Sequence, residues 1–185
     1  AYTQPKLIGK KKKPEIIEIA LGNNDLSFGK SLLEKDIKIQ DIFKEGQLVD
    51  IHAVTKAKGF QGPVKRFGVR LRSHKSEKVK RGPGSLGAWN QQQHIMYRVA
   101  HAGQMGYHTR VDYNKSILKI SNNSDEINPK GGFLKYGEVK NDYILVKGSL
   151  PGVVKRLIRL TSPIRPKKNM EVVPEITKIS LASKQ

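Results

Sequence analysis

The sequence predicts a mainly β protein, a small barrel or sandwich that one long basic loop interrupts. Short apolar or alternating stretches recur along its 185 residues, and clusters of Gly, Pro, Asn and Asp separate them. This pattern is typical of small β-domains. Between two of the predicted strands lies a glycine-rich basic segment, residues 56–110, which is too long for an ordinary connection and is therefore expected to be functional.

The first part of the chain predicts an arm, a strand and a short helix. Residues 1–14 end in GKKKKP and suit an extended basic arm, which is either a solvated tail or an RNA contact. Residues 15–21, EIIEIAL, predict a short strand. Asp25 or Ser27 is expected to cap a helix that runs to Leu33, with its leucines on the buried side.

The remaining strands are expected on both sides of the basic segment. Residues 37–43, IKIQDIF, alternate as in a short strand, and residues 48–54 alternate in a way that predicts a half-buried strand. Strand signals return at 116–121, 143–147, 153–160 and 176–181, with turn clusters between them.

The charge of the chain indicates a polyanionic partner. Thirty-five Lys and Arg residues oppose 16 Asp and Glu residues, which gives a net charge of +19. A segment as basic as residues 56–81 cannot form a core of its own, and Glu77 is the only acid within it. Nucleic acid, and folded RNA in particular, is the expected partner. No membrane contact is expected, because no apolar run approaches ~20 residues.

No catalytic set, metal site or cofactor is predicted. Gly82–Gly87 has the spacing of a dinucleotide-binding fingerprint, but a basic run precedes it and the nearest later acid is Asp112. His94, His101 and His108 are evenly spaced, yet carboxylates are nearly absent around them, so a role beside RNA is favoured over a metal site. The absence of cysteine excludes disulfides and thiolate metal sites.

The aromatic residues of the basic segment are candidates for stacking on unpaired bases. Trp89 has no apolar neighbours in sequence, which favours RNA contact over local packing at a tip. For Phe60, Phe67 and Tyr97, packing at the base of the segment is an equal alternative.

Many short motifs follow one another along the chain in the same order as in one known family. They are Phe43-Lys-Glu-Gly46, Val54-Thr-Lys56, Gly59-Phe-Gln-Gly-Pro-Val-Lys-Arg66, Gly84-Ser-Leu-Gly87 with Trp89, Ala102-Gly-Gln-Met-Gly106, Tyr113-Asn114, Gly131-Gly132, Tyr136-Gly137, Asn141-Asp142 and Lys147-Gly148-Ser149. Together they resemble ribosomal protein L three of the large ribosomal subunit, in its archaeal or eukaryote-like form. The sequence departs from that family at Asn90–Gln93, just after the tryptophan, and lacks an N-terminal stretch that such members carry, so a fragment or a reduced protein is expected.

The resemblance implies a closed six-stranded translation-protein-like β-barrel with a long RNA-penetrating loop and short helical segments. The expected divisions are a basic arm (1–14), two parts of the barrel (15–56 and 111–162), the loop with its tip near Trp89 (57–110) and a C-terminal basic segment with a final strand (163–185). The residues expected to contact RNA are Lys56, Lys58, Phe60, Gln61, Lys65, Arg66, Arg70, Arg72, His74, Lys75, Lys78, Lys80, Arg81, Trp89, Gln104, Tyr107, His108, Arg110 and Lys147.

The function implied by the resemblance is structural and not enzymatic. The chain is expected to bind large-subunit ribosomal RNA, support subunit assembly and approach the peptidyl transferase centre, next to neighbouring ribosomal proteins in the cytoplasmic ribosome. No small-molecule substrate is implied. The alternative is an extraribosomal RNA-binding chaperone or regulator that uses the same barrel.

Overall fold

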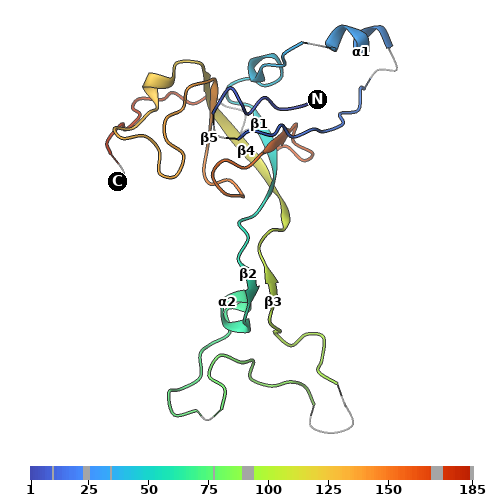
Figure 1. The fold of residues 1–185 in the computed structure, drawn as a ribbon, viewed down its shortest axis with the longest axis vertical. Coiled ribbons are helices and arrows are strands. Elements are labelled where there is room, and N and C mark those ends of the chain that lie inside the picture. The colour runs from blue at the N-terminus through green and yellow to red at the C-terminus, as the bar shows by residue number, and fades with distance from the viewer. Residues whose placement is uncertain are drawn as a thin grey trace. The chain divides into compact units, whose positions relative to one another are not determined.

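The computed structural model describes residues 1–9, 11–22, 26–33, 35–76, 78–88, 94–167 and 173–183. The chain divides into two compact units, which Figure 1 traces. Unit 1 contains Ala1–Ala53 and Val111–Gln185, and unit 2 contains Val54–Arg110. The long basic segment of the sequence therefore corresponds largely to unit 2.

Unit 1 is built around one four-stranded sheet with the order β5-β4-β1-β6. Its strands are β1 (Leu48–Val54), β4 (Thr109–Ser121), β5 (Tyr143–Val146) and β6 (Arg159–Thr161). β6 pairs antiparallel with β1, and β5 pairs antiparallel with β4. An irregularity between Ile117 and Lys119 shifts the register of β4 against β5. β1 is thus a central strand, with β4 on one side and β6 on the other.

The core of unit 1 lies on β1 and β4. Its buried cluster consists of Phe43, Val49, Ile51 and Ile117, and partly buried side chains such as Leu160 pack against it. The first four residues of β1 are all buried, so both faces of this strand are covered there. The expected strand at 48–54 is confirmed, but its burial exceeds the half-buried pattern that alternation predicts.

A buried carboxylate joins three segments of unit 1. Asp50 on β1 is fully buried. The backbone N–H of Asn114 donates to its Oδ1 at 2.9 Å, and the backbone N–H of Ile164 donates to its Oδ2 at 3.0 Å. Asn114 has φ 54°, a left-handed conformation that asparagine tolerates better than most residues. Both carboxylate oxygens are therefore satisfied inside the unit, as burial of a charged group requires.

The N-terminal part of unit 1 contains less regular structure than the sequence predicts. Helix α1 (Leu26–Leu32) confirms the predicted helix, but none of its residues is buried and Leu26 is 80% exposed. The strand expected at 15–21 is wrong, since only an isolated bridge from Tyr2 to Ile16 forms there. The strand expected at 37–43 is also wrong, because a 3₁₀ turn (Ile39–Asp41) occupies that segment.

The C-terminal strand predictions are partly correct. β5 confirms the strand expected at 143–147, while β4 extends well before the predicted 116–121. Only the end of 153–160 becomes strand, as part of β6, and no strand forms in 176–181. A second 3₁₀ turn (Ser124–Glu126) lies in a predicted turn cluster.

The closed six-stranded barrel is wrong. Among the described residues, four strands form one sheet and two others form a separate hairpin. β5 and β6 are the edges of the four-stranded sheet and have four and three residues, respectively. The apolar segment at 15–21 forms no ladder: Ile16 makes only an isolated bridge to Tyr2, and Ile16 and Ile19 remain 80% and 62% exposed. Without further strands to bridge its two edges, β5 and β6, the sheet stays open and forms no barrel.

Unit 2 begins and ends in a hairpin. β2 (Gly59–Gln61) pairs antiparallel with β3 (Gly103–Met105), and helix α2 (Pro63–Phe67) follows β2 directly. Proline suits the first turn of α2 because its missing N–H has no partner there in any helix. Gly68 ends the helix with φ 71°, the left-handed cap that glycine adopts without strain. The sequence patterns predict none of these three short elements.

Replacing Asp50 by asparagine is expected to destabilise unit 1. The amide retains one acceptor but turns an N–H₂ group toward the other backbone donor, so one buried hydrogen bond is lost. We expect the free energy of unfolding to fall by about 1–3 kcal/mol. Urea unfolding followed by circular dichroism measures this change. Asp142→Asn, at an exposed position, is the matched control; equal effects of the two substitutions would contradict the role of Asp50.

A partly exposed ion pair between β4 and the second 3₁₀ turn predicts a dependence of stability on pH. Lys119 Nζ pairs with Glu126 Oε2, and Asn123 Nδ2 donates to Glu126 Oε1 at 3.0 Å. The hydrogen bond from Lys119 lowers the pKa of Glu126 below its usual 4.5 and raises the pKa of Lys119 above 10.5. The contribution of Glu126 to stability is thus complete above its unfolded pKa and is lost as the pH falls through its folded pKa.

Glu126→Gln is expected to flatten the acid side of the stability profile. Urea midpoints between about pH 6 and pH 3 should fall less in this variant than in the parent chain. Glu138→Gln removes an exposed carboxylate elsewhere and should leave the profile unchanged. Identical profiles for Glu126→Gln and the parent would show that the ion pair contributes nothing.

Candidate nucleic-acid interface

The first and last segments of unit 2 are hydrogen-bonded to each other. The Thr55 N–H donates to the His108 carbonyl at 3.0 Å, and the His108 N–H donates to Thr55 Oγ1 at 3.2 Å. Gly106, at φ 74°, lies beside this pairing, and a Cβ on it would be only 2.0 Å from the Lys56 carbonyl oxygen. Only glycine therefore fits here.

The hairpin β2–β3 continues this pairing into unit 2. Phe60 faces Gln104 across the hairpin, and the Lys58 N–H donates to the Met105 carbonyl at 2.9 Å. Gln61 Nε2 donates to the Lys58 carbonyl at 2.6 Å. The hairpin is held by main-chain and amide hydrogen bonds, which leave the lysine ammonium groups in solvent.

Arg66 on α2 cross-links the hairpin region from within. Its Nη1 donates to the His101 carbonyl at 2.9 Å, and its guanidinium lies 5.0 Å from the centre of the Phe67 ring. A Cβ on Gly103 would come within 2.9 Å of the same Nη1. The missing side chain of Gly103 thus makes room for the guanidinium, and Arg66 fastens α2 to the segment before β3.

Arg72 closes a smaller loop in the same manner. Its Nη2 donates to the carbonyls of Pro83 and Gly84 at 2.8 and 3.2 Å, and its backbone N–H donates to the Lys80 carbonyl at 3.2 Å. These three bonds define a basic subloop between Arg72 and Gly84. Both arginines were expected to contact RNA, and the structure shows in addition that each has a structural partner.

The other predicted cations of unit 2 lie in solvent. The exposed members of the predicted set are Lys56, Lys58, Lys65, Arg70, His74, Lys75, Lys78, Lys80, Arg81, His108 and Arg110. Lys147 is exposed as well, but it belongs to unit 1. Since Glu77 is the only acid in the sequence of unit 2, nothing within the unit balances this charge.

The described aromatic side chains of unit 2 are largely uncovered. Phe60 is 77% exposed and Tyr97 is 98% exposed, so packing at the base of the loop is wrong for these two residues. Phe67 is 57% exposed, and the guanidinium of Arg66 lies over its ring. Tyr107 is 65% exposed, and its backbone has a φ of 57°. Exposed rings among cations match what stacking on bases requires.

Trp89 and the Asn90–Gln93 departure fall outside the described residues. Tyr97 was a candidate for base stacking, with packing as its alternative, and its ring is 98% exposed. The neighbouring Arg98 is exposed as well, and it was not among the predicted contacts. The signal for Arg98 in the sequence is its position directly after an aromatic residue of the basic segment.

Neither a metal-ligating cluster nor a membrane-spanning helix is found in the part of the chain that the structure describes. No three histidine or carboxylate side chains there are grouped closely enough to hold a metal ion. The evenly spaced histidines of the sequence are thus not brought together. No helix in the described ranges has the length and apolar character to cross a membrane.

Comparison with known proteins gives one consistent family. The family model described as "Ribosomal protein L3" matches residues 1–185. A large ribosomal subunit protein uL3 from Methanocaldococcus jannaschii is 52% identical over 191 residues, and those from Methanobrevibacter smithii and Archaeoglobus fulgidus are 50% and 47% identical. Each match covers 100% of this chain and 57% of the relative, so the chain spans little more than half the length of these proteins.

Arg66→Lys is expected to loosen unit 2 without changing its charge. A lysine cannot reproduce the planar contact of the guanidinium with Phe67 while donating to the His101 carbonyl. Loss of the bond, worth about 1 kcal/mol, should speed amide exchange in β3 roughly fivefold. Hydrogen exchange read by mass spectrometry or NMR tests this. Arg70→Lys, at an exposed arginine of the same unit, should leave β3 exchange unchanged.

Proposed function

Because the chain belongs to the ribosomal protein L3 family, we propose that it is a structural constituent of the large ribosomal subunit and binds large-subunit ribosomal RNA. The observation that carries this proposal is the unbalanced positive charge of unit 2. The unit exposes many lysine and arginine side chains, and its sequence contains a single acid. The proposed partners are ribosomal RNA and neighbouring proteins of the subunit, and the proposed location is the ribosome in the cytoplasm. The role is binding and positioning, not catalysis.

The lysines and arginines of unit 2 act on the RNA backbone. Cations that neutralise phosphates release condensed counterions, so binding weakens steeply as salt rises. Such contacts fix position and carry no base information of their own. The exposed rings of Phe60, Tyr97 and Tyr107 add stacking on unpaired bases, and the glycines permit close approach of the backbone to phosphates.

The two units have different roles in this proposal. Unit 1 supplies a folded anchor, and residues 57–110 form the loop that enters folded RNA, with Trp89 near its tip. In the intact subunit this loop supports assembly and the RNA around the peptidyl transferase centre. The pairing of Thr55 with His108, beside Gly106, supports this proposal, because it holds the two ends of unit 2 next to each other.

The test is the sedimentation of this protein in lysates of the cells that produce it. We expect it to move with the large subunit, and to remain there after a wash at about 0.5 M salt, because a threaded loop is held by shape as well as by charge. Release into the light fractions would contradict an integral role and would favour the RNA-binding chaperone or regulator.

Charge variants locate the interface. Joint replacement of Lys65, Lys75 and Lys80 by alanine should lower the slope of log affinity against log salt by about 3, one per phosphate contact. The control replaces Lys44, Lys140 and Lys178, three exposed lysines of unit 1, and makes the same change in net charge. Equal slopes for the two triple variants would mean that net charge, and not unit 2, holds the RNA.

A further inference from the structure

An arginine and a tyrosine lie beside each other on the surface of unit 1. The Arg165 guanidinium lies over the Tyr113 ring, with its central carbon 5.8 Å from the centre of the ring. This distance is within the range of a cation–π contact. Tyr113 is 48% exposed, and Arg165 is exposed as well. Neither residue was among the predicted RNA contacts.

The buried carboxylate of Asp50 positions both residues through their neighbours. Its Oδ1 accepts from the N–H of Asn114, which follows Tyr113 in the chain. Its Oδ2 accepts from the N–H of Ile164, which precedes Arg165. Each of these bonds is one residue away from the exposed pair, so the buried carboxylate brings the ring and the guanidinium together from two distant parts of the sequence.

The backbone on both sides of Arg165 is restricted as well. Pro163 has a fixed φ, and Pro166 disfavours the helical region for the residue before it, which is Arg165. The segment therefore reaches the ring with few alternative conformations. A side chain that is already held in place loses less conformational entropy when it binds a ligand.

The guanidinium of Arg165 keeps its hydrogen-bond donors for a ligand. Arg66 and Arg72 donate to backbone carbonyls of unit 2. In contrast, no ion pair or hydrogen bond engages the Arg165 guanidinium within the described part of the chain. Five N–H donors in one plane are the arrangement that matches two oxygens of a phosphate.

Further cations lie along the same part of β4. Lys115 is on the strand, and its Nζ is 3.5 Å from Asp112 Oδ2. The Lys147 N–H donates to the Ser116 carbonyl at 2.9 Å, which places this second lysine next to the strand. Among the described residues, Asp112 is the only carboxylate paired with any of these cations. The charge left by Lys147 and Arg165 therefore suits a polyanion.

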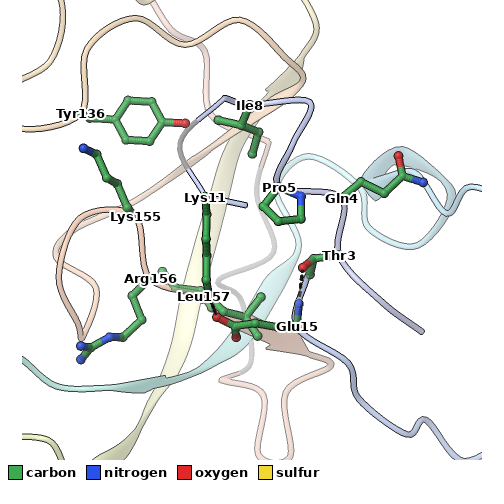
Figure 2. Close-up of a pocket in the computed structure, with 11 residues that line it drawn as sticks. Thr3, Gln4, Pro5, Ile8, Lys11, Glu15, Tyr136, Lys155, Arg156 and Leu157 are labelled. Atoms are coloured by element: carbon green, nitrogen blue, oxygen red, sulfur yellow. Dashed lines mark hydrogen bonds and ion pairs between the residues drawn. The ribbon is translucent and has the colours of Figure 1, made fainter. Parts of the chain in front are cut away.

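The cavity of unit 1 offers no comparable site, although basic residues line it. It has a volume of about 360 Å³. Figure 2 shows the Lys155 ammonium and the Arg156 guanidinium pointing away from each other. Lys11, a third lining cation, is paired with Glu15. These cations do not converge on one anion, which leaves Arg165 as the cation of unit 1 that is best prepared to bind one.

We propose that Arg165, held over the Tyr113 ring, binds one phosphate of the RNA backbone through two parallel N–H···O hydrogen bonds. Such paired bonds between a guanidinium and a phosphate are short, strong and directional. Asp50 is a positioning residue, which acts through Asn114 and Ile164 and does not touch the RNA. The inference rests on the proposed function and adds to it a phosphate contact in unit 1, outside the basic segment of the sequence.

The first test uses the full chain with isotope-labelled arginine side chains and dimethyl phosphate as the probe. The Nε–H signal of Arg165 should shift more than that of Arg159, an exposed arginine of β6 that faces His52 across the sheet. Both arginines carry the same charge, so only the arrangement around Arg165 distinguishes them. Equal shifts would mean a general attraction of anions and would overturn the site.

The second test measures the affinity of an RNA hairpin with an unpaired loop for charge-conserving variants. Arg165→Lys keeps the charge but cannot present two donors in one plane, so the affinity should fall roughly tenfold. Arg159→Lys is the matched control and should bind as the parent chain does. If both variants bind like the parent, the phosphate site is wrong and RNA binding by the chain stands.

The third test asks whether the ring and the guanidinium act as one unit. Tyr113→Leu should weaken binding of the same hairpin roughly threefold, and Tyr113→Phe, which retains the ring, should restore it. Combining Tyr113→Leu with Arg165→Lys should cost little more than Arg165→Lys alone. Full additivity of the two losses would contradict the proposal. The amide signals of Asn114 and Ile164 report whether the contacts of Asp50 survive in each variant.

The outcomes separate this inference from the proposed function. If the parent chain binds no RNA hairpin, both fail. If the hairpin binds and the Arg165 signal does not move, the phosphate site fails and the proposed function stands. If an acidic peptide shifts the Arg165 signal and the hairpin does not, the partner of Arg165 is a protein and the inference is overturned.

Discussion

The carboxylate of Asp50 is the contact on which unit 1 most depends. It lies fully buried in the central strand β1 and accepts one backbone hydrogen bond from Asn114 on β4 and another from Ile164, just after β6. A buried charge is tolerated only when such donors satisfy it. Because the fully buried apolar cluster is small, this polar junction fixes how the three segments meet more precisely than apolar packing alone does.

Unit 2 is organised differently, because it has almost no core. Pro63 is its one buried residue among those described. Its order comes from the β2–β3 hairpin, from Gly106 against the Lys56 carbonyl, and from Arg66, which fastens α2 to the segment before β3. Hydrogen bonds of this exposed kind stabilise weakly compared with a packed interior. The fold of unit 2 therefore depends on these few contacts and not on a packed interior.

Patterns within short stretches of the sequence were enough to predict two strands and one helix. β1 follows from alternation, β5 from the strand signal at 143–147 and α1 from its capping residues and leucines, and all three form close to where they were expected. Pairings over long distances could not be predicted in this way. Asp50 and Asn114 are 64 residues apart, and nothing in either neighbourhood shows that one N–H will meet one carboxylate. The apolar run at 15–21 resembles a strand, but a strand requires a partner, and only Tyr2 bridges to it.

For the interface, the composition of the sequence led to a polyanion as the expected partner, but it did not predict the structural roles of individual residues. Arg66 and Arg72 have the same local signature as the neighbouring cations for which we propose phosphate contacts, yet each donates to backbone carbonyls. The reason lies in the composition of the unit, where Glu77 is the only carboxylate that could pair with them. A guanidinium has five N–H donors, and a carbonyl partner carries no charge to neutralise it. These arginines consequently hold the loop together and still contribute their full positive charge to its attraction for a polyanion. A carboxylate partner in the same place would neutralise one of those charges and would weaken the attraction for RNA that we propose for this loop.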